Sequence, residues 1–310
     1  MFILLAIAVA GFLAQLIDGS LGMGYGVSST TMLLTIGLAP ALASASVHLA
    51  EIGTSGISGA SHWRMGNVDM RILLLLGIPG GVGAFLGAVV LSNLSLDAAK
   101  PWVSVVLLML GAVIIFKFLH MRRRAAMATR PAVLEPERHP QPAKPRRRRT
   151  WMLTPLGIAG GFLDASGGGG WGPVVTSTLM AAGRLKPRTI IGTVSGSEFI
   201  VSIAASIGFL LALGSEIIRW DIVAMMLLGG SIAAPISAWL VRKFDDRALG
   251  TAVGALIILL NVDRLLLMLG LDAAAVTTVR LFAIVAAAGI IIMLIAKGRA
   301  MRATAEGSPA

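Results

Sequence analysis

Apolar segments of about 20 residues follow one another through most of this chain, which is the length that a helix needs to cross the hydrocarbon core of a bilayer. Only 13% of the residues are charged, whereas soluble domains carry about 25%. Strands of a membrane β-barrel would instead alternate apolar and polar residues over roughly 10 positions. The sequence therefore predicts an all-α polytopic membrane protein.

Two kinds of apolar segment alternate along the chain. Four of them are too short to cross a bilayer straight, so each pair forms either a re-entrant hairpin or two short tilted helices, and the sequence leaves both alternatives open. The short pairs are predicted at 2–16 with 25–37, and at 151–163 with 172–183. Full spans are predicted near 41–62, 70–91, 101–120, 188–213, 221–241, 247–269 and 275–296.

Matching glycine-rich stretches separate the two members of each short pair. They read DGSLGMGYG from Asp18 and DASGGGGWG from Asp164. In the same alignment of the two halves, Glu51 falls opposite Glu198. Counting membrane crossings places the two copies in opposite orientations, so we expect two inverted-topology repeats. Inverted repeats that are interrupted by glycine at corresponding positions point to a transporter site near the membrane midplane.

A basic segment divides the chain between the two predicted repeats. Eleven of the 26 Lys and Arg residues lie between Lys117 and Arg149, in a proline-rich composition that is typical of disorder. A basic segment next to a membrane span favours the cytoplasmic side and anionic lipid, not nucleic acid. We therefore expect a protein of the cytoplasmic (inner) membrane with its central linker and C-terminus in the cytoplasm. The expected parts are a first transmembrane repeat (1–120), a disordered linker (121–150), a second repeat with a final helix (151–298) and a tail (299–310).

The sequence resembles the TauE/SafE sulfite exporter family, also called the toluenesulfonate uptake permease family. The resemblance rests on FLAQLIDGSLGMGYG and GIAGGFLDASGGGGWG, each followed by a Thr-containing helix, and on the duplicated architecture. It covers nearly the whole chain except the basic linker, whose length departs from the family. The resemblance implies secondary transport of sulfite, thiosulfate or organosulfonates by alternating access. Tyr25 in the first motif and Trp171 in the second bear on the choice of substrate.

The glycine breaks themselves predict an anion site. Helices that start near Gly24 and Gly170 leave their first backbone N–H groups unpaired and carry partial positive charge there. The alternative is that the glycines only allow close helix packing, which is the role we expect for the glycines between 77 and 87. Ser28 and Ser177 are further candidate donors. The predicted substrate-binding residues are Gly22, Gly24, Tyr25, Gly26, Ser29, Thr30, His48, Gly168, Gly170, Trp171, Gly172, Thr176 and Ser195.

A polar stripe at helical spacing runs along the span at 41–62, and the span at 188–213 repeats it in part. Such a stripe should face a cavity or a helix interface instead of lipid. We hypothesise that Glu51 or Glu198 binds a proton and couples transport to the proton gradient; the alternative is a neutral structural glutamate. Asp18 and Asp164 are expected to cap the glycine turns, with coordination of a coupling cation as a second possibility. The stripe consists of Ser44, His48, Glu51, Ser55, Ser58 and His62, and the partial repeat of Ser195, Glu198 and Ser202.

Several function classes are not supported by the sequence. The chain has no cysteine, and one His with one Glu is too few for a tetrahedral metal shell, so we expect neither a metal nor another cofactor. It contains no P-loop motif for ATP hydrolysis, no G-x-S-x-G and no H-E-x-x-H, so we expect it not to be an enzyme. A passive anion channel and a transporter of another small anion, such as a carboxylate or a metal oxyanion, remain alternatives. The sequence does not determine the oligomeric state.

Overall fold

The computed structural model describes residues 2–21, 23–128, 150–182, 185, 187–240 and 246–306. Every regular element in these ranges is a helix, which agrees with the expected all-α class. The predictions for Gly22 and for residues 129–149 of the basic linker fall outside the described residues. In the first half the helices are α1 (Phe2–Leu21), α2 (Tyr25–Thr35), α3 (Pro40–Arg64), α4 (Met70–Asn93) and α5 (Leu96–Ala128). In the second half they are η1 (Thr150–Met152), α6 (Leu153–Gly167), η2 (Gly172–Thr176), α7 (Ser177–Ala182), α8 (Pro187–Leu213), α9 (Trp220–Leu240), α10 (Asp246–Met268) and α11 (Ala273–Glu306).

The long helices lie where the sequence predicts full spans. Among the described residues, three segments are long and apolar enough to cross a membrane by themselves, namely Met70–Asn93, Leu96–Lys117 and Thr189–Leu213. Shorter apolar segments occur at Ile3–Asp18, Trp220–Ala234 and Ala273–Ala286. Helix α3 is absent from both groups because its polar stripe lowers its mean hydropathy, although the helix is 25 residues long.

Four predicted boundaries need correction, among them the end of the last helix, because α11 continues to Glu306 instead of ending at 296. Helix α1 continues to Leu21 instead of ending at 16, and α6 continues to Gly167 instead of 163. Both motif aspartates therefore lie near the end of a helix, and each break begins at the glycines that follow. Helix α5 continues to Ala128, so residues 121–128 are helical although we expected disorder there. Their sequence, MRRRAAMA, consists of strong helix formers, which explains the extension.

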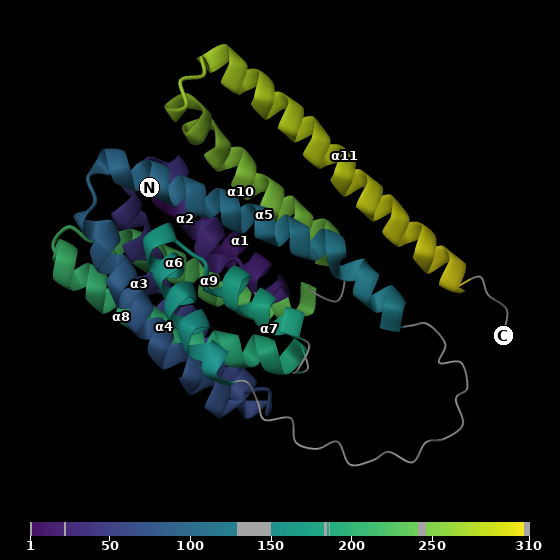
Figure 1. Ribbon diagram of the computed structural model, residues 1–310, viewed down its shortest axis with the longest axis horizontal. Coiled ribbons are helices and arrows are strands. Elements are labelled where there is room, and N and C mark those ends of the chain that lie inside the picture. Colours follow the sequence, from purple (N-terminus) through teal and green to yellow (C-terminus); the bar gives the residue numbers. More distant parts are fainter. Residues whose placement is uncertain are drawn as a thin grey trace.

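The two halves interlock (Figure 1). Helix α1 lies against α9 and α6 lies against α4, so the first α-helix of each half packs on the fourth α-helix of the other. Helix α3 packs on α8 and α5 packs on α10. This set of pairings is unchanged when the halves are exchanged, which is compatible with the predicted repeats. Their inverted orientation stays a prediction. Helix α11 lies outermost along α10 (Figure 1).

Glycines allow the interlocking helices to approach closely. A Cβ on Gly87 of α4 would lie 2.6 Å from the carbonyl oxygen of Phe162 in α6. A Cβ on Gly11 of α1 would lie 2.6 Å from the carbonyl oxygen of Met226 in α9. Small residues give membrane helices this kind of contact. The packing role predicted for the glycines between 77 and 87 is confirmed at Gly87.

Candidate functional site

The two glycine breaks lie against each other. A Cβ on Gly26 would lie 2.8 Å from the Cα of Gly169 and 3.1 Å from a carboxyl oxygen of Glu51. A Cβ on Gly169 would overlap the backbone of Gly26 and Val27. Gly169 also has a φ of 128°, which residues with side chains rarely adopt. Both the turn and the contact between the breaks therefore depend on this glycine.

Each motif aspartate caps the helix start that follows it. The Oδ1 atom of Asp164 accepts hydrogen bonds from the backbone N–H of Gly170 at 2.6 Å and of Trp171 at 2.9 Å. The Oδ1 atom of Asp18 accepts one from the N–H of Tyr25 at 3.4 Å. The predicted capping role is confirmed. The expectation that the first N–H groups are unpaired is wrong for Gly170, Trp171 and Tyr25, because these carboxylates accept their hydrogen bonds.

His48 joins α3 to the second of these caps. Its Nε2 atom lies 3.2 Å from Oδ2 of Asp164, and its Nδ1 atom lies 2.8 Å from the carbonyl oxygen of Ser44. The Ser44 hydroxyl donates to the carbonyl oxygen of Ala165 at 2.7 Å. His48 and Asp164 are both buried, at 0% and 2% exposure. The polar stripe of α3 is thus fixed to the end of α6 by two adjacent hydrogen-bonded contacts.

A cavity next to this pair is surrounded by acidic and hydroxyl side chains. Asp18 comes from α1, Glu51 from α3 and Glu198 from α8, and the cavity has a volume of about 220 Å³ including its opening. The Ser202 hydroxyl lies 3.5 Å from Oε2 of Glu51, at the limit of a hydrogen bond. The prediction that the polar stripe faces a cavity is confirmed for its central part. The lining residues are Gln15, Asp18, Tyr25, Glu51, Thr54, Ser55, Ser58, Ser195 and Glu198.

Two lining residues, Gln15 and Thr54, are not among the sequence predictions. Gln15 precedes Asp18 by three positions and Thr54 follows Glu51 by three, so each shares a helix face with a predicted acid. That spacing is the sequence signal that could have identified Gln15 and Thr54.

Asp164 corrects the sequence argument about metals. That argument found one His and one Glu with no further ligand nearby, but the ligand atoms of His48, Glu51 and Asp164 lie within 4.8 Å of one another. Asp164 was missed because 116 positions separate it from His48. Its two oxygens already bind His48 and the backbone of the break. The cluster is therefore satisfied within the protein, and the absence of a metal remains our prediction.

Four buried hydroxyl groups at the start of α2 have no hydrogen-bond partner among the described residues. They belong to Tyr25, Ser28, Ser29 and Thr30, whose exposure is between 0% and 5%. Buried polar groups are nearly always hydrogen-bonded, so these unpaired hydroxyls are candidate partners for a ligand or for water. Three of the four were predicted as substrate-binding residues or donors within the first two turns of this helix, and Tyr25 was predicted from its motif.

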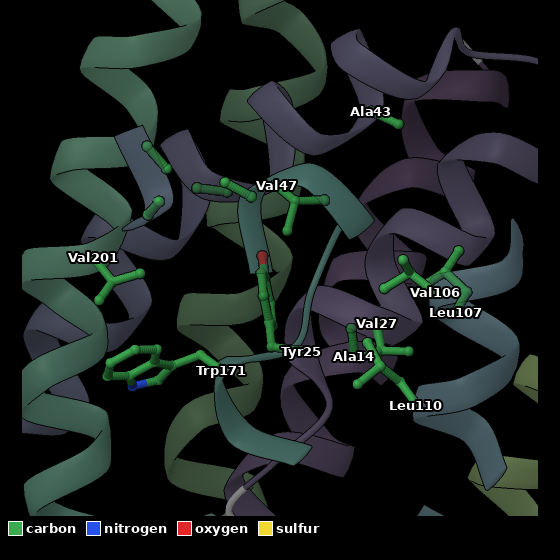
Figure 2. Packing of buried hydrophobic residues seen from close by; sticks show 14 of the residues in the cluster. Ala14, Tyr25, Val27, Ala43, Val47, Val106, Leu107, Leu110, Trp171 and Val201 are labelled. Carbon is green, nitrogen blue, oxygen red and sulfur yellow. The ribbon is translucent and has the colours of Figure 1, made fainter. Parts of the chain in front are cut away.

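Tyr25 and Trp171 occupy corresponding motif positions but point in different directions (Figure 2). Tyr25 lines the cavity. The indole of Trp171 is fully buried and extends toward Val201, and its N–H donates to the carbonyl oxygen of Val194 at 3.3 Å. A Cβ on Gly80 would lie 2.5 Å from the Trp171 ring. The two breaks therefore differ, because the first directs its aromatic side chain to the cavity and the second directs it into helix packing.

The remaining predicted substrate residues fall into three places. Gly24 is the N-cap of α2 with a φ of 123°, and Gly168 ends α6 and lies against the side chain of Thr30. Gly172 and Thr176 lie in η2, a π-helical turn. Ser195 lines the cavity. The structure thus brings most of the predicted set to the contact between the breaks or to the cavity, whereas Trp171 is directed elsewhere.

Comparison with known proteins gives four findings. The family model described as sulfite exporter TauE/SafE matches residues 7–263. The probable membrane transporter protein YtnM of Bacillus subtilis (strain 168) is 48% identical over 263 residues, which cover 85% of this chain and 83% of the relative. The probable membrane transporter protein YdhB of the same organism is 28% identical over 211 residues, covering 68% and 78%. No solved structure matches.

Proposed function

The chain belongs to the sulfite exporter TauE/SafE family, and from this premise we propose that it is a multi-pass membrane transporter of small sulfur-containing anions such as sulfite, thiosulfate or organosulfonates. The proposed mechanism is alternating access, driven by the proton gradient across the cytoplasmic membrane. The family and the relatives' names support membrane transport. The substrate class, the coupling ion and the membrane are our proposal.

One observation carries the choice of an anion. The start of α2 combines a helix N-terminus with the unpaired hydroxyls of Ser28, Ser29 and Thr30, and it lies against the second glycine break. Hydroxyl and backbone N–H donors together suit an oxyanion, and the partial positive charge of the helix start favours it. Asp18 holds one N–H of this start at 3.4 Å, a longer contact than either bond of Asp164. An incoming anion would therefore have to replace a weaker carboxylate hydrogen bond at the first break than at the second.

The proposal is tested by uptake of labelled sulfite into proteoliposomes. We expect saturable uptake that thiosulfate and an organosulfonate block and that lactate does not. Equal block by lactate would support a transporter whose substrate is a carboxylate instead of a sulfur-containing anion. Currents far above carrier turnover, without counterflow, would show an anion channel instead.

The unpaired hydroxyls give a prediction about affinity. Replacing Ser29 by alanine and Thr30 by valine is expected to raise the KM for the anion about tenfold for each hydroxyl that binds it, because a hydrogen bond to a charged group contributes roughly 1.5–3 kcal/mol. The matched control is Ser46→Ala, since the Ser46 hydroxyl already donates to the carbonyl oxygen of Leu42. If the α2 variants and the control give the same KM, the anion does not bind at the start of α2.

The cavity acids give a prediction about coupling. Glu51→Gln and Glu198→Gln are expected to reduce the ratio of gradient-driven uptake to anion exchange, because an amide does not take up a proton. The measurement compares uptake under an inward proton gradient with exchange at equal anion concentrations. The matched control is Glu216→Gln in the loop before α9, outside the cavity. A ratio that stays at the wild-type value in both cavity variants would remove the proton role from these glutamates.

A further inference from the structure

We propose that His48 and Asp164 together form a proton-binding site. A proton that arrives at this site from the cavity controls the strength of the hydrogen bonds that Asp164 accepts from the second glycine break. This inference deepens the proposed function, because it names the group at which the driving proton acts. It involves neither Glu51 nor Glu198 as the final proton acceptor. It assigns to His48 a role different from the substrate binding that the sequence predicts.

The hydrogen bonds of His48 determine how many protons the pair holds. The carbonyl oxygen of Ser44 only accepts, so Nδ1 of His48 must carry a proton to make its 2.8 Å contact. A neutral imidazole then has a bare Nε2, which would face a bare oxygen of an ionised Asp164 at 3.2 Å. Two buried hydrogen-bond acceptors repel each other, so Nε2 of His48 and Oδ2 of Asp164 would not stay 3.2 Å apart without a proton between them. The pair therefore contains one further proton, either on Nε2 or on Oδ2.

The surroundings keep this pair in contact with the cavity but outside it. Glu51 lines the cavity, and a carboxyl oxygen of Glu51 lies within 4.8 Å of a ring nitrogen of His48 and of a carboxyl oxygen of Asp164. Neither His48 nor Asp164 lines the cavity. Glu51 is thus the described ionisable residue that reaches both the cavity and the pair. A proton that enters the cavity has a short path through Glu51 to the pair.

The charged groups that face the pair are mostly acids. Glu51 comes from α3, Glu198 from α8 and Asp18 from α1, and all three line the cavity beside the pair. Lys117 of α5 donates to the sulfur of Met23 at 3.2 Å. Burying several negative charges around one cavity is unfavourable.

A second proton on the pair changes the second glycine break. With one shared proton the pair has no net charge; a second proton leaves His48 as imidazolium and Asp164 as a neutral carboxylic acid, with a net charge of one positive unit. This charge balances one negative unit on a monovalent anion. A neutral carboxyl group is also a weaker acceptor than a carboxylate, so its bonds to Gly170 and Trp171 weaken. The adjoining Gly169 lies on Gly26 and Val27 at the start of α2, so the change reaches the proposed anion site.

The proton site is tested by two measurements on the full-length protein in lipid. The first follows the ¹⁵N signals of His48 by solid-state NMR as the pH is varied, with His48→Gln to assign them. We expect these signals to change with pH differently in Asp164→Asn, because the pair then lacks the carboxyl group that shares the proton. Asparagine keeps an acceptor for the cap, so this variant is expected to fold. The control is Asp221→Asn, an exposed residue that pairs with Arg219, which should leave the pH dependence of these signals unchanged.

The second measurement compares gradient-driven uptake with anion exchange. His48→Gln is expected to lower the ratio of the two toward one, whereas His62→Gln at the end of α3 should keep the wild-type ratio. A pH dependence of the signals that is the same in wild type and Asp164→Asn, or a wild-type ratio in His48→Gln, would overturn the inference. If wild type shows no exchange of any sulfur anion, the proposed function is wrong, and the NMR titration still decides whether His48 and Asp164 share a proton.

Discussion

Replacing Asp164 by alanine is expected to destabilise the protein by about 3–5 kcal/mol, the range measured when one partner of a buried charged pair is removed, and to abolish transport. Alanine removes the acceptor for the N–H groups of Gly170 and Trp171. It also leaves Nε2 of His48 without its partner in a fully buried position. The cap and the pair depend on the same carboxylate, so both losses occur together.

The measurement is thermal unfolding of purified variants in detergent, together with flux in proteoliposomes. Asp164→Asn is the matched control, because asparagine is as good an N-cap as aspartate but has no ionisable proton. We expect the asparagine variant to unfold near the wild-type temperature while its coupling to the gradient is lost. An alanine variant as stable as the asparagine variant would show that the cap contributes little.

The second large effect is expected at Gly169. Replacing it by alanine should prevent the two glycine breaks from meeting, because the new Cβ overlaps the backbone of Gly26 and Val27. Backbone atoms cannot move aside as a flexible side chain does, so the helices must separate. We expect loss of transport and a large fall in the yield of folded protein, measured by flux and by size-exclusion chromatography.

Gly37→Ala separates the two causes of this effect. Gly37 also has a positive φ, 95°, but nothing lies within 4 Å of the position that its Cβ would occupy. The control variant therefore carries the backbone strain alone, about 1–2 kcal/mol. If Gly169→Ala behaves like Gly37→Ala, the breaks are not held in contact, and the site described above is wrong.

The sequence predicts the features that depend on local pattern. Apolar length locates the spans, the steps of three and four residues locate the polar face of α3, and an aspartate before a glycine turn predicts its cap. The caps at Gly170 and Tyr25 confirm the last of these. Each of these features is determined by side chains within one or two helical turns, so neighbouring residues are enough to identify them.

The features that depend on distant packing are not predictable in this way. The contact of His48 with Asp164 joins residues 116 positions apart, and no spacing rule reports it. Trp171 and Tyr25 occupy corresponding positions, yet one enters helix packing and the other the cavity, because Gly80 makes room for the larger ring on one side only. The extension of α5 to Ala128 was missed for another reason, since composition obscured the helix propensity of a short basic run.

The interlocked pairing of the halves has a consequence for how the chain is made. Helix α1 (Phe2–Leu21) is synthesised well before its partner α9 (Trp220–Leu240). Until α9 is present, the small-residue face of α1 at Gly11 meets lipid in place of the backbone at Met226. The helices of the first half therefore remain loosely packed in the bilayer until their partners in the second half, α6 and α9, are inserted.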